Sequence, residues 1–209
     1  MDSLINFDGL GEAVKTLINR LADGIGWIVT RETPQKTAVN TYIEEIQKSD
    51  LDPIVKAALI SKAKKNIREY CNQNDIVNIA LEMIDDTAKP ENVHEDWLNQ
   101  FMDKARYVSD DEFQLIWAKV LAEECNEPGS IPKKLLHILE QIEKQEAEVF
   151  SKICTVSICV EDSECKYTPF IMGPALQEYY EELGITFESM VELQALGLIE
   201  MAFGFSTSP

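Results

Sequence analysis

Residues that could do chemistry are few and widely spaced in this chain. Glu124 and Glu127 stand three residues apart on a predicted helix, so they could share one cation, but no second pair of ligands accompanies them. The two histidines, His94 and His137, lie far apart, and neither belongs to a nucleophile–base motif. The chain also contains no phosphate-binding loop, dinucleotide fingerprint, nucleophile elbow or HExxH motif. We therefore expect no catalytic residue, no metal ligand and no cofactor.

The cysteines point to reduced thiols rather than to a metal or a disulfide framework. There are five of them, and they are Cys71, Cys125, Cys154, Cys159 and Cys165. The last three lack the short paired spacing of structural zinc sites. An odd number of cysteines without a secretory signal is typical of an intracellular protein. We expect a cytoplasmic protein, with peripheral contact to the inner membrane as the alternative.

Charge is distributed unevenly along the 209 residues, whose formal net charge is −18. Residues 1–82 carry ten basic and twelve acidic side chains, whereas residues 83–209 carry nine basic and 25 acidic ones. A hydrophobic content of 45% is ordinary for a globular protein. The acidic half repels phosphate backbones and anionic lipid, so we expect no direct binding of nucleic acid.

The firmest structural signals lie between residues 109 and 153. Ser109 and Glu112 have the spacing of a capping box, and Pro128-Gly129 ends the helix that follows. Apolar residues recur at helical spacing in this helix and in the next two. The predicted structural core of this region consists of Phe113, Trp117, Leu121, Leu136, Leu139 and Phe150.

The same stretch resembles an uncharacterised bacterial family of unknown function. The likeness rests on a WAxxLAxE motif that starts at Trp117 and on Pro128-Gly129-Ser130. It extends upstream to Glu95-Asp96-Trp97 and downstream to Leu193–Ile199, and it includes the segment from Leu17 to Trp27. That family is loosely related to abortive-infection, alpha-type phage-resistance proteins. The resemblance implies a role in phage defence, and it brings no catalytic residues.

Residues 1–33 predict an N-terminal amphipathic helix. Charged residues interrupt it, so it cannot span a bilayer. Its apolar face can pack on the protein's own core or on a sister subunit, or it can lie in a membrane interface. The polar face is poor in Lys and Arg, which favours the protein contact. The residues of this interface or membrane face are Leu10, Val14, Leu17, Ile18, Leu21, Ile25, Trp27 and Ile28.

A helix that starts at Asp52-Pro53 carries the main basic stripe. The stripe is made by Lys56, Lys62, Lys65 and Arg68. Such a stripe is usually a solvated face, but it can also dock an acidic partner, including the acidic half of another copy. Together with the N-terminal apolar face, it predicts a homo-oligomer, most simply a dimer that buries residues 10–28.

After Cys154 the pattern changes to two short strands, Thr155–Val160 and Tyr167–Met172, followed by helices. Leu193–Ile199 with the extended segment after it resembles the end of a winged helix-turn-helix. The helix before it carries Glu188 and Glu192 and no basic residue, so we expect protein contact there rather than DNA binding. The chain stops where a wing strand should return, which indicates a truncated C-terminus or a strand completed by a partner.

The sequence thus predicts a mainly α protein in three parts. These are the N-terminal helix (1–33), a helical bundle (34–153) and a small α+β, winged-helix-like module (154–209). We expect a non-enzymatic, intracellular bacterial protein that acts through protein–protein contacts in phage defence. The alternatives are a membrane-active effector that uses the N-terminal helix, and an acidic regulator or nucleic-acid mimic.

Overall fold

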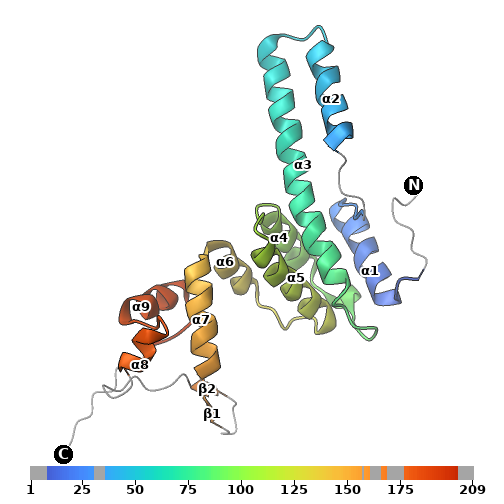
Figure 1. Cartoon of the computed structure of the whole chain (residues 1–209). Helices are drawn as coiled ribbons and strands as arrows, with labels where there is room; N and C mark the ends of the chain where they lie inside the picture. Colours follow the sequence, from blue (N-terminus) through green and yellow to red (C-terminus); the bar gives the residue numbers. More distant parts are fainter. Residues whose placement is uncertain (1–8, 31–35, 157, 161–165, 169–176, 202–209) are drawn as a thin grey trace, which may run out of the picture. The chain divides into compact units, whose positions relative to one another are not determined.

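The computed structural model describes residues 9–30, 36–156, 158–160, 166–168 and 177–201, and these are mainly helical, as predicted (Figure 1). The chain divides into a first unit, Met1–Leu136, and a second unit, His137–Pro209. The first unit contains α1 (Glu12–Arg20), a π-helical turn (Leu21–Ile25), α2 (Lys36–Lys48), α3 (Pro53–Leu81), a 3-10 turn (Pro90–Asn92), α4 (Glu95–Ala105) and α5 (Asp111–Asn126). Helix α6 (Lys133–Gln141) spans the division.

An aromatic row forms the centre of the first unit, where α3, α4 and α5 pack together. Trp97 stacks on Phe101 at 5.3 Å between ring centroids, and Phe101 meets Trp117 at 5.4 Å in a tilted arrangement. All three rings are buried, as are Leu121 and Leu136. The other residues of the predicted core, which are Phe113, Leu139 and Phe150, are half-buried.

Helix α5 begins one residue later than the predicted capping box requires. The N-cap is Asp110, whose Oδ1 accepts hydrogen bonds from the amides of Glu112 (3.0 Å) and Phe113 (3.1 Å). The assignment of Ser109 as the cap is therefore wrong. A carboxylate satisfies two end amides at once and also interacts favourably with the positive end of the helix dipole, so it is the better cap here.

A buried carboxylate holds the turn after α5 in place. Glu124 is 2% exposed, and its two oxygens accept hydrogen bonds from the amides of Gly129 and Ile131, each at 2.9 Å. The Trp97 indole donates to the carbonyl of Ile131 at 2.9 Å from the other side. Gly129 has φ +89°, a left-handed conformation that favours glycine. Glu124 is thus a turn-binding residue, and Glu127, its proposed partner in a cation site, is exposed.

Helix α3 continues without a break through the polar residues at Asn72–Asp75. Asn72 is buried and donates to the carbonyl of Arg106 at 2.8 Å. Gln73 donates to the carbonyl of Met102, also at 2.8 Å. Both side chains therefore satisfy carbonyl groups at the C-terminal end of α4, which would otherwise lack partners.

The next turn of α3 binds the backbone that follows α1. Asn74 Oδ1 accepts from the Thr30 amide at 3.0 Å, and Asn78 Nδ2 donates to the Thr30 carbonyl at 2.9 Å. The Tyr70 hydroxyl donates to the Ile28 carbonyl at 2.8 Å. These contacts give the non-helical segment after α1 the backbone partners that it needs. We name the four amide residues the polar seam: Asn72, Gln73, Asn74 and Asn78.

The second unit has a small core of its own. It contains α7 (Lys144–Val156), β1 (Ile158–Val160), β2 (Lys166–Thr168), α8 (Gln177–Glu182) and α9 (Phe187–Leu196). Ile153 of α7 is buried together with Tyr180, Ile185 and Leu193. The predicted domain boundary after residue 153 therefore falls too late, because α7 supplies part of this core and the division lies at 136/137.

The first strand is shorter than predicted. Helix α7 runs through Val156, so the first strand begins at Ile158 rather than at Thr155, and β1 pairs antiparallel with β2 with Cys159 opposite Tyr167. The end of the second predicted strand and the segment after residue 201 lie outside the described residues. The winged-helix-like arrangement therefore stays a prediction.

Thr186 caps α9 through a reciprocal pair of hydrogen bonds with Ser189.

We expect Glu124→Ala to lower the free energy of unfolding by about 2–4 kcal/mol, because it leaves the amides of Gly129 and Ile131 without their buried, charged acceptor. Urea unfolding followed by tryptophan fluorescence checks this. The matched control is Glu123→Ala, since Glu123 is the exposed neighbour on the same helix and should change the free energy by less than about 0.5 kcal/mol. Equal effects of the two variants would contradict the role given to Glu124.

Candidate interaction surface

A two-helix arm projects from the first unit beyond α4 and α5 (Figure 1). We define the arm as residues 36–68, which comprise α2 and the first part of α3. Apolar residues on one side of α2, Val39, Ile43 and Ile46, are half-buried or buried, and α2 packs against α3. A pair of helices buries one side of each partner, so the outer faces of the arm lie in water.

The turn at the end of the arm is held by its own hydrogen bonds. Asp52 caps α3 by accepting from the amide of Ile54 at 2.8 Å. Lys56 is half-buried and donates to the Gln47 carbonyl at 3.0 Å, across the turn. The side chain of Lys56 is therefore occupied by this contact across the turn, unlike those of Lys62 and Arg68 in the predicted basic stripe.

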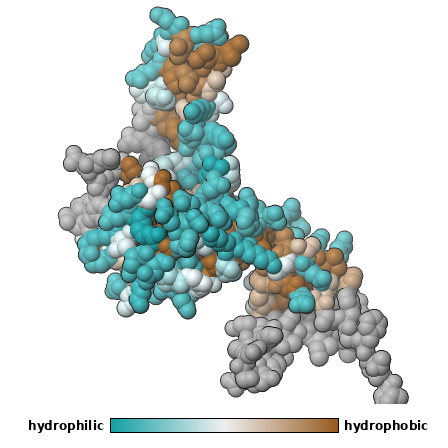
Figure 2. All heavy atoms as spheres, turned by 180° about the vertical axis from the view of Figure 1, so that it is seen from behind, coloured by the Kyte–Doolittle hydropathy of each residue, from teal (hydrophilic) through white to brown (hydrophobic). Residues whose placement is uncertain are grey.

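Apolar side chains gather at the end of the arm (Figure 2). Ile54 is 79% exposed, the largest value among the exposed large hydrophobic residues of the described chain. Exposed apolar groups scattered singly are normal, but a contiguous group of them indicates a contact surface. We name this group the apolar tip, and it consists of Tyr42, Leu51, Ile54, Val55 and Leu59.

Exposed basic residues continue from the apolar tip along α3. Ile54, Ala58, Lys62 and Lys65 follow one another at spacings of four, four and three, which places them on one face of the helix. Lys65 has an ion pair with Glu69 at 3.6 Å, and Arg68 is exposed one turn further on. Lys62 and Arg68 are exposed and Lys65 is mostly exposed, although its partner Glu69 is half-buried, so the basic stripe stays accessible to a partner.

The N-terminal apolar face packs within the first unit. Leu17 and Leu21 are completely buried, and Val14 and Ile18 are buried as well. This is the own-core alternative of the three that the sequence left open. The face is therefore not available to lipid or to a sister subunit, because the chain's own side chains cover its centre. Leu10, Ile25 and Trp27 are half-buried, and Ile28 is exposed.

Trp27 has local partners in place of the predicted membrane boundary. Its ring lies 5.5 Å from that of Tyr70, and its indole donates to Gln73 Oε1 at 3.1 Å. Gln73 thus links the segment after α1 to α4 through the polar seam. Within the described residues, no helix has the length and apolar character that crossing a membrane requires.

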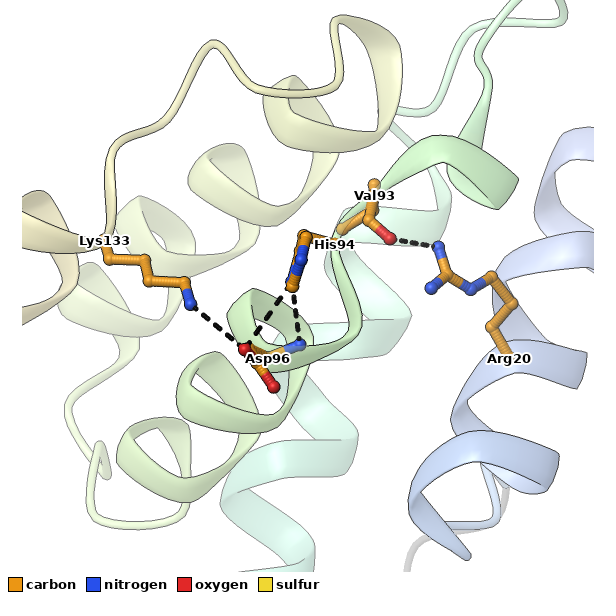
Figure 3. A network of polar contacts seen from close by, with 5 residues as sticks. All are labelled: Arg20, Val93, His94, Asp96 and Lys133. Carbon is orange, nitrogen blue, oxygen red and sulfur yellow. Dashed lines mark hydrogen bonds and ion pairs between the residues drawn. The ribbon is translucent and has the colours of Figure 1, made fainter.

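A hollow of about 290 Å³ lies beside α1 and α4. Arg20 borders it and donates to the carbonyls of Pro90 and Val93, the latter at 2.6 Å (Figure 3). His94 caps α4 by accepting from the Asp96 amide, and Lys133 lies 3.7 Å from the Asp96 carboxylate. The side chains of this network are used in backbone contacts and exposed ion pairs. In the described part of the chain, no group of three or more metal-binding side chains comes together.

Cys125 is a buried thiol rather than a reactive one. Burial, and next the neighbouring Glu124 carboxylate, raises the pKa of Cys125 to about 12, against a smaller opposing effect of Arg20. At neutral pH the nucleophilic thiolate is therefore almost absent. Burial also raises the pKa of Cys71 and of the exposed Cys154.

The raised pKa of Cys125 predicts a loss of stability at high pH. The folded state keeps its proton above the unfolded thiol's pKa near 9, so the stabilisation is complete below about pH 9 and declines as the pH rises toward 12. Cys125→Ala removes this dependence. Urea unfolding at pH 8 and pH 10.5 should therefore show a smaller decrease for Cys125→Ala than for the parent, and equal decreases would contradict the assignment.

The comparisons with known proteins identify one family. Its model, described as "Protein of unknown function (DUF2806)", matches residues 61–203. No curated protein and no solved structure matches the chain. The matched residues begin within α3, so they include the polar seam and Glu124, while the apolar tip precedes them. The match spans well over half of the sequence, and the chain belongs to this DUF2806 family of unknown function.

Proposed function

We propose that this protein is a non-enzymatic, intracellular docking protein whose arm binds a protein partner. The observation that carries the proposal is the exposure of the apolar tip, led by Ile54 at 79%. Leaving such groups in water is unfavourable, and transferring one isoleucine side chain into an interface contributes about 1.5–3 kcal/mol. Apolar residues at the centre of a contact with charged residues around them are the usual composition of a protein interface.

A protein partner is favoured over a membrane. The apolar face of α1, on which a membrane-active effector would depend, is buried, and lipid would have to displace it from the core. Among the described residues, the apolar tip is another apolar surface that lipid could contact. The basic residues beside it follow one side of α3 for several turns. A helix face of that length suits the groove of a partner protein better than the membrane interface, which only the end of the arm would enter.

Phage defence is the proposed setting, and its support is the motif resemblance to an uncharacterised bacterial family that is loosely related to abortive-infection proteins. An acidic regulator that occupies a basic partner is a second candidate, favoured by the exposed Glu188 and Glu192 of α9.

Plaque counts on a bacterial host test the role in phage defence. Expression of the parent chain should lower the counts, Ile54→Glu should abolish this protection, and Leu115→Glu, at an exposed residue of α5, should keep it.

A photoreactive phenylalanine analogue at position 54 should form a covalent adduct with a protein in living cells. The same analogue at position 115 is the matched control, because Leu115 is an exposed apolar residue of the same unit but lies on α5. Val55→Glu should lower the yield from position 54 by about tenfold or more, since a buried valine side chain contributes over 1.4 kcal/mol.

Gel shifts and mass spectrometry of the adducts read the result. Protein adducts from position 54 that are absent from position 115 support the docking function. Lipid adducts from position 54 would favour the membrane alternative, and equal adducts from both positions would overturn the proposal.

A further inference from the structure

The second unit carries a surface that complements the arm. On α9, Phe187 is 57% exposed and Val191 is 44% exposed, and they lie one turn apart on the same face. Glu188 and Glu192 are exposed directly beside them, also one turn apart. The helix contains no basic residue. We name these four residues the α9 face.

The arm and the second unit have opposite charges. Residues 36–68 contain seven basic and four acidic side chains, whereas residues 137–209 contain three basic and thirteen acidic ones. Contact between two arms would bring like charges together, and so would contact between two second units. Of the pairings that copies of this chain can make with these surfaces, only arm to α9 face joins opposite charges. Complementary charge of this kind steers association and selects the partner.

The two surfaces also agree in their pattern. The arm presents Val55 and Leu59, which lie one turn apart on α3 and are followed along the helix by Lys62 and Lys65. The α9 face presents an apolar pair with a row of glutamates beside it. Apolar groups one turn apart on two helices can pack as ridges into grooves, which brings the charged side chains to the edge of the contact. There they contribute to specificity more than to affinity.

We propose that the arm of one copy docks on the α9 face of a second copy. The inference rests on the proposed docking function and names its partner. The contact joins different surfaces on the two copies, so it is heterologous. Two copies that exchange arms form a closed dimer, and copies that each bind the next form a longer assembly.

Sedimentation velocity of the full chain at about 50 mM and about 500 mM salt tests the proposal, because added salt screens exposed charges. The arm variant is Lys62→Glu with Lys65→Glu, and the face variant is Glu188→Lys with Glu192→Lys. All four side chains are exposed, so circular dichroism should not change. Lys65 pairs with the half-buried Glu69, so a melting temperature of the arm variant close to that of the parent is the check that the arm stays folded. The parent should associate more weakly at high salt. Each variant alone should associate about tenfold more weakly than the parent, since two opposite-charge contacts become repulsive.

Mixing the two variants is the decisive measurement. An arm variant and a face variant carry opposite charges where they meet, so the mixture should recover association to within about threefold of the parent. A single chain that carries all four substitutions should recover it too. The control is Glu178→Lys with Glu182→Lys on α8, which makes the same charge change at the same spacing and should leave association unchanged.

A monomeric parent at all concentrations would overturn the inference, as would failure of the mixture to recover. A mixture that fails while each variant alone still associates would indicate contact between like surfaces, which also overturns it. If the chain is monomeric while position 54 forms adducts with a different protein, this inference fails and the docking function stands. Binding of anionic vesicles, lost in the arm variant and without self-association, would contradict both.

Discussion

The first unit depends on the hydrogen bonds that the buried and half-buried amide side chains of α3 make with the backbone of neighbouring elements. Helix ends and non-helical segments leave backbone groups without partners, and burying such groups costs free energy unless they are satisfied. Asn72 and Gln73 satisfy the end of α4, and Asn74 and Asn78 satisfy the segment after α1. One stretch of one helix thus fixes three elements against each other, which an apolar stripe, being non-directional, would not do.

The residues of the family motif likewise combine an apolar side chain that fills the core with a polar one that binds backbone groups. Trp117 fills the aromatic core, and Glu124 ties Pro128-Gly129-Ser130 back to α5 through two amides. The matched family region therefore contains the parts that hold the scaffold together. The apolar tip, by contrast, contributes nothing evident to the stability of the scaffold. Because the exposed apolar side chains of the tip do not stabilise the fold, binding to a partner is the role that accounts for them.

Much of the helical structure was predictable, because spacings of three and four mark a helix whatever its surroundings. The N-cap of α5 was missed by one residue, since Ser109 and Asp110 both suit the position and only the backbone decides between them. The apolar tip was missed for a different reason. Periodicity shows that Ile54 lies on an apolar side of a helix, but not whether a third helix covers that side. The sequence did not show what Asn72 and Asn74 of α3 bind in the core, because their backbone partners are distant in sequence.

Continuity of α3 gives the arm the properties of a lever. About 18 residues separate Ile54 from Asn72, which corresponds to roughly 27 Å of helix at 1.5 Å per residue. Because the seam grips α3 at one end, a tilt of about 10° there displaces the far end by roughly 5 Å over that length. A small change in the amide contacts would therefore move the apolar tip by several ångströms while α3 stays helical. The reach of this protein is set at its core.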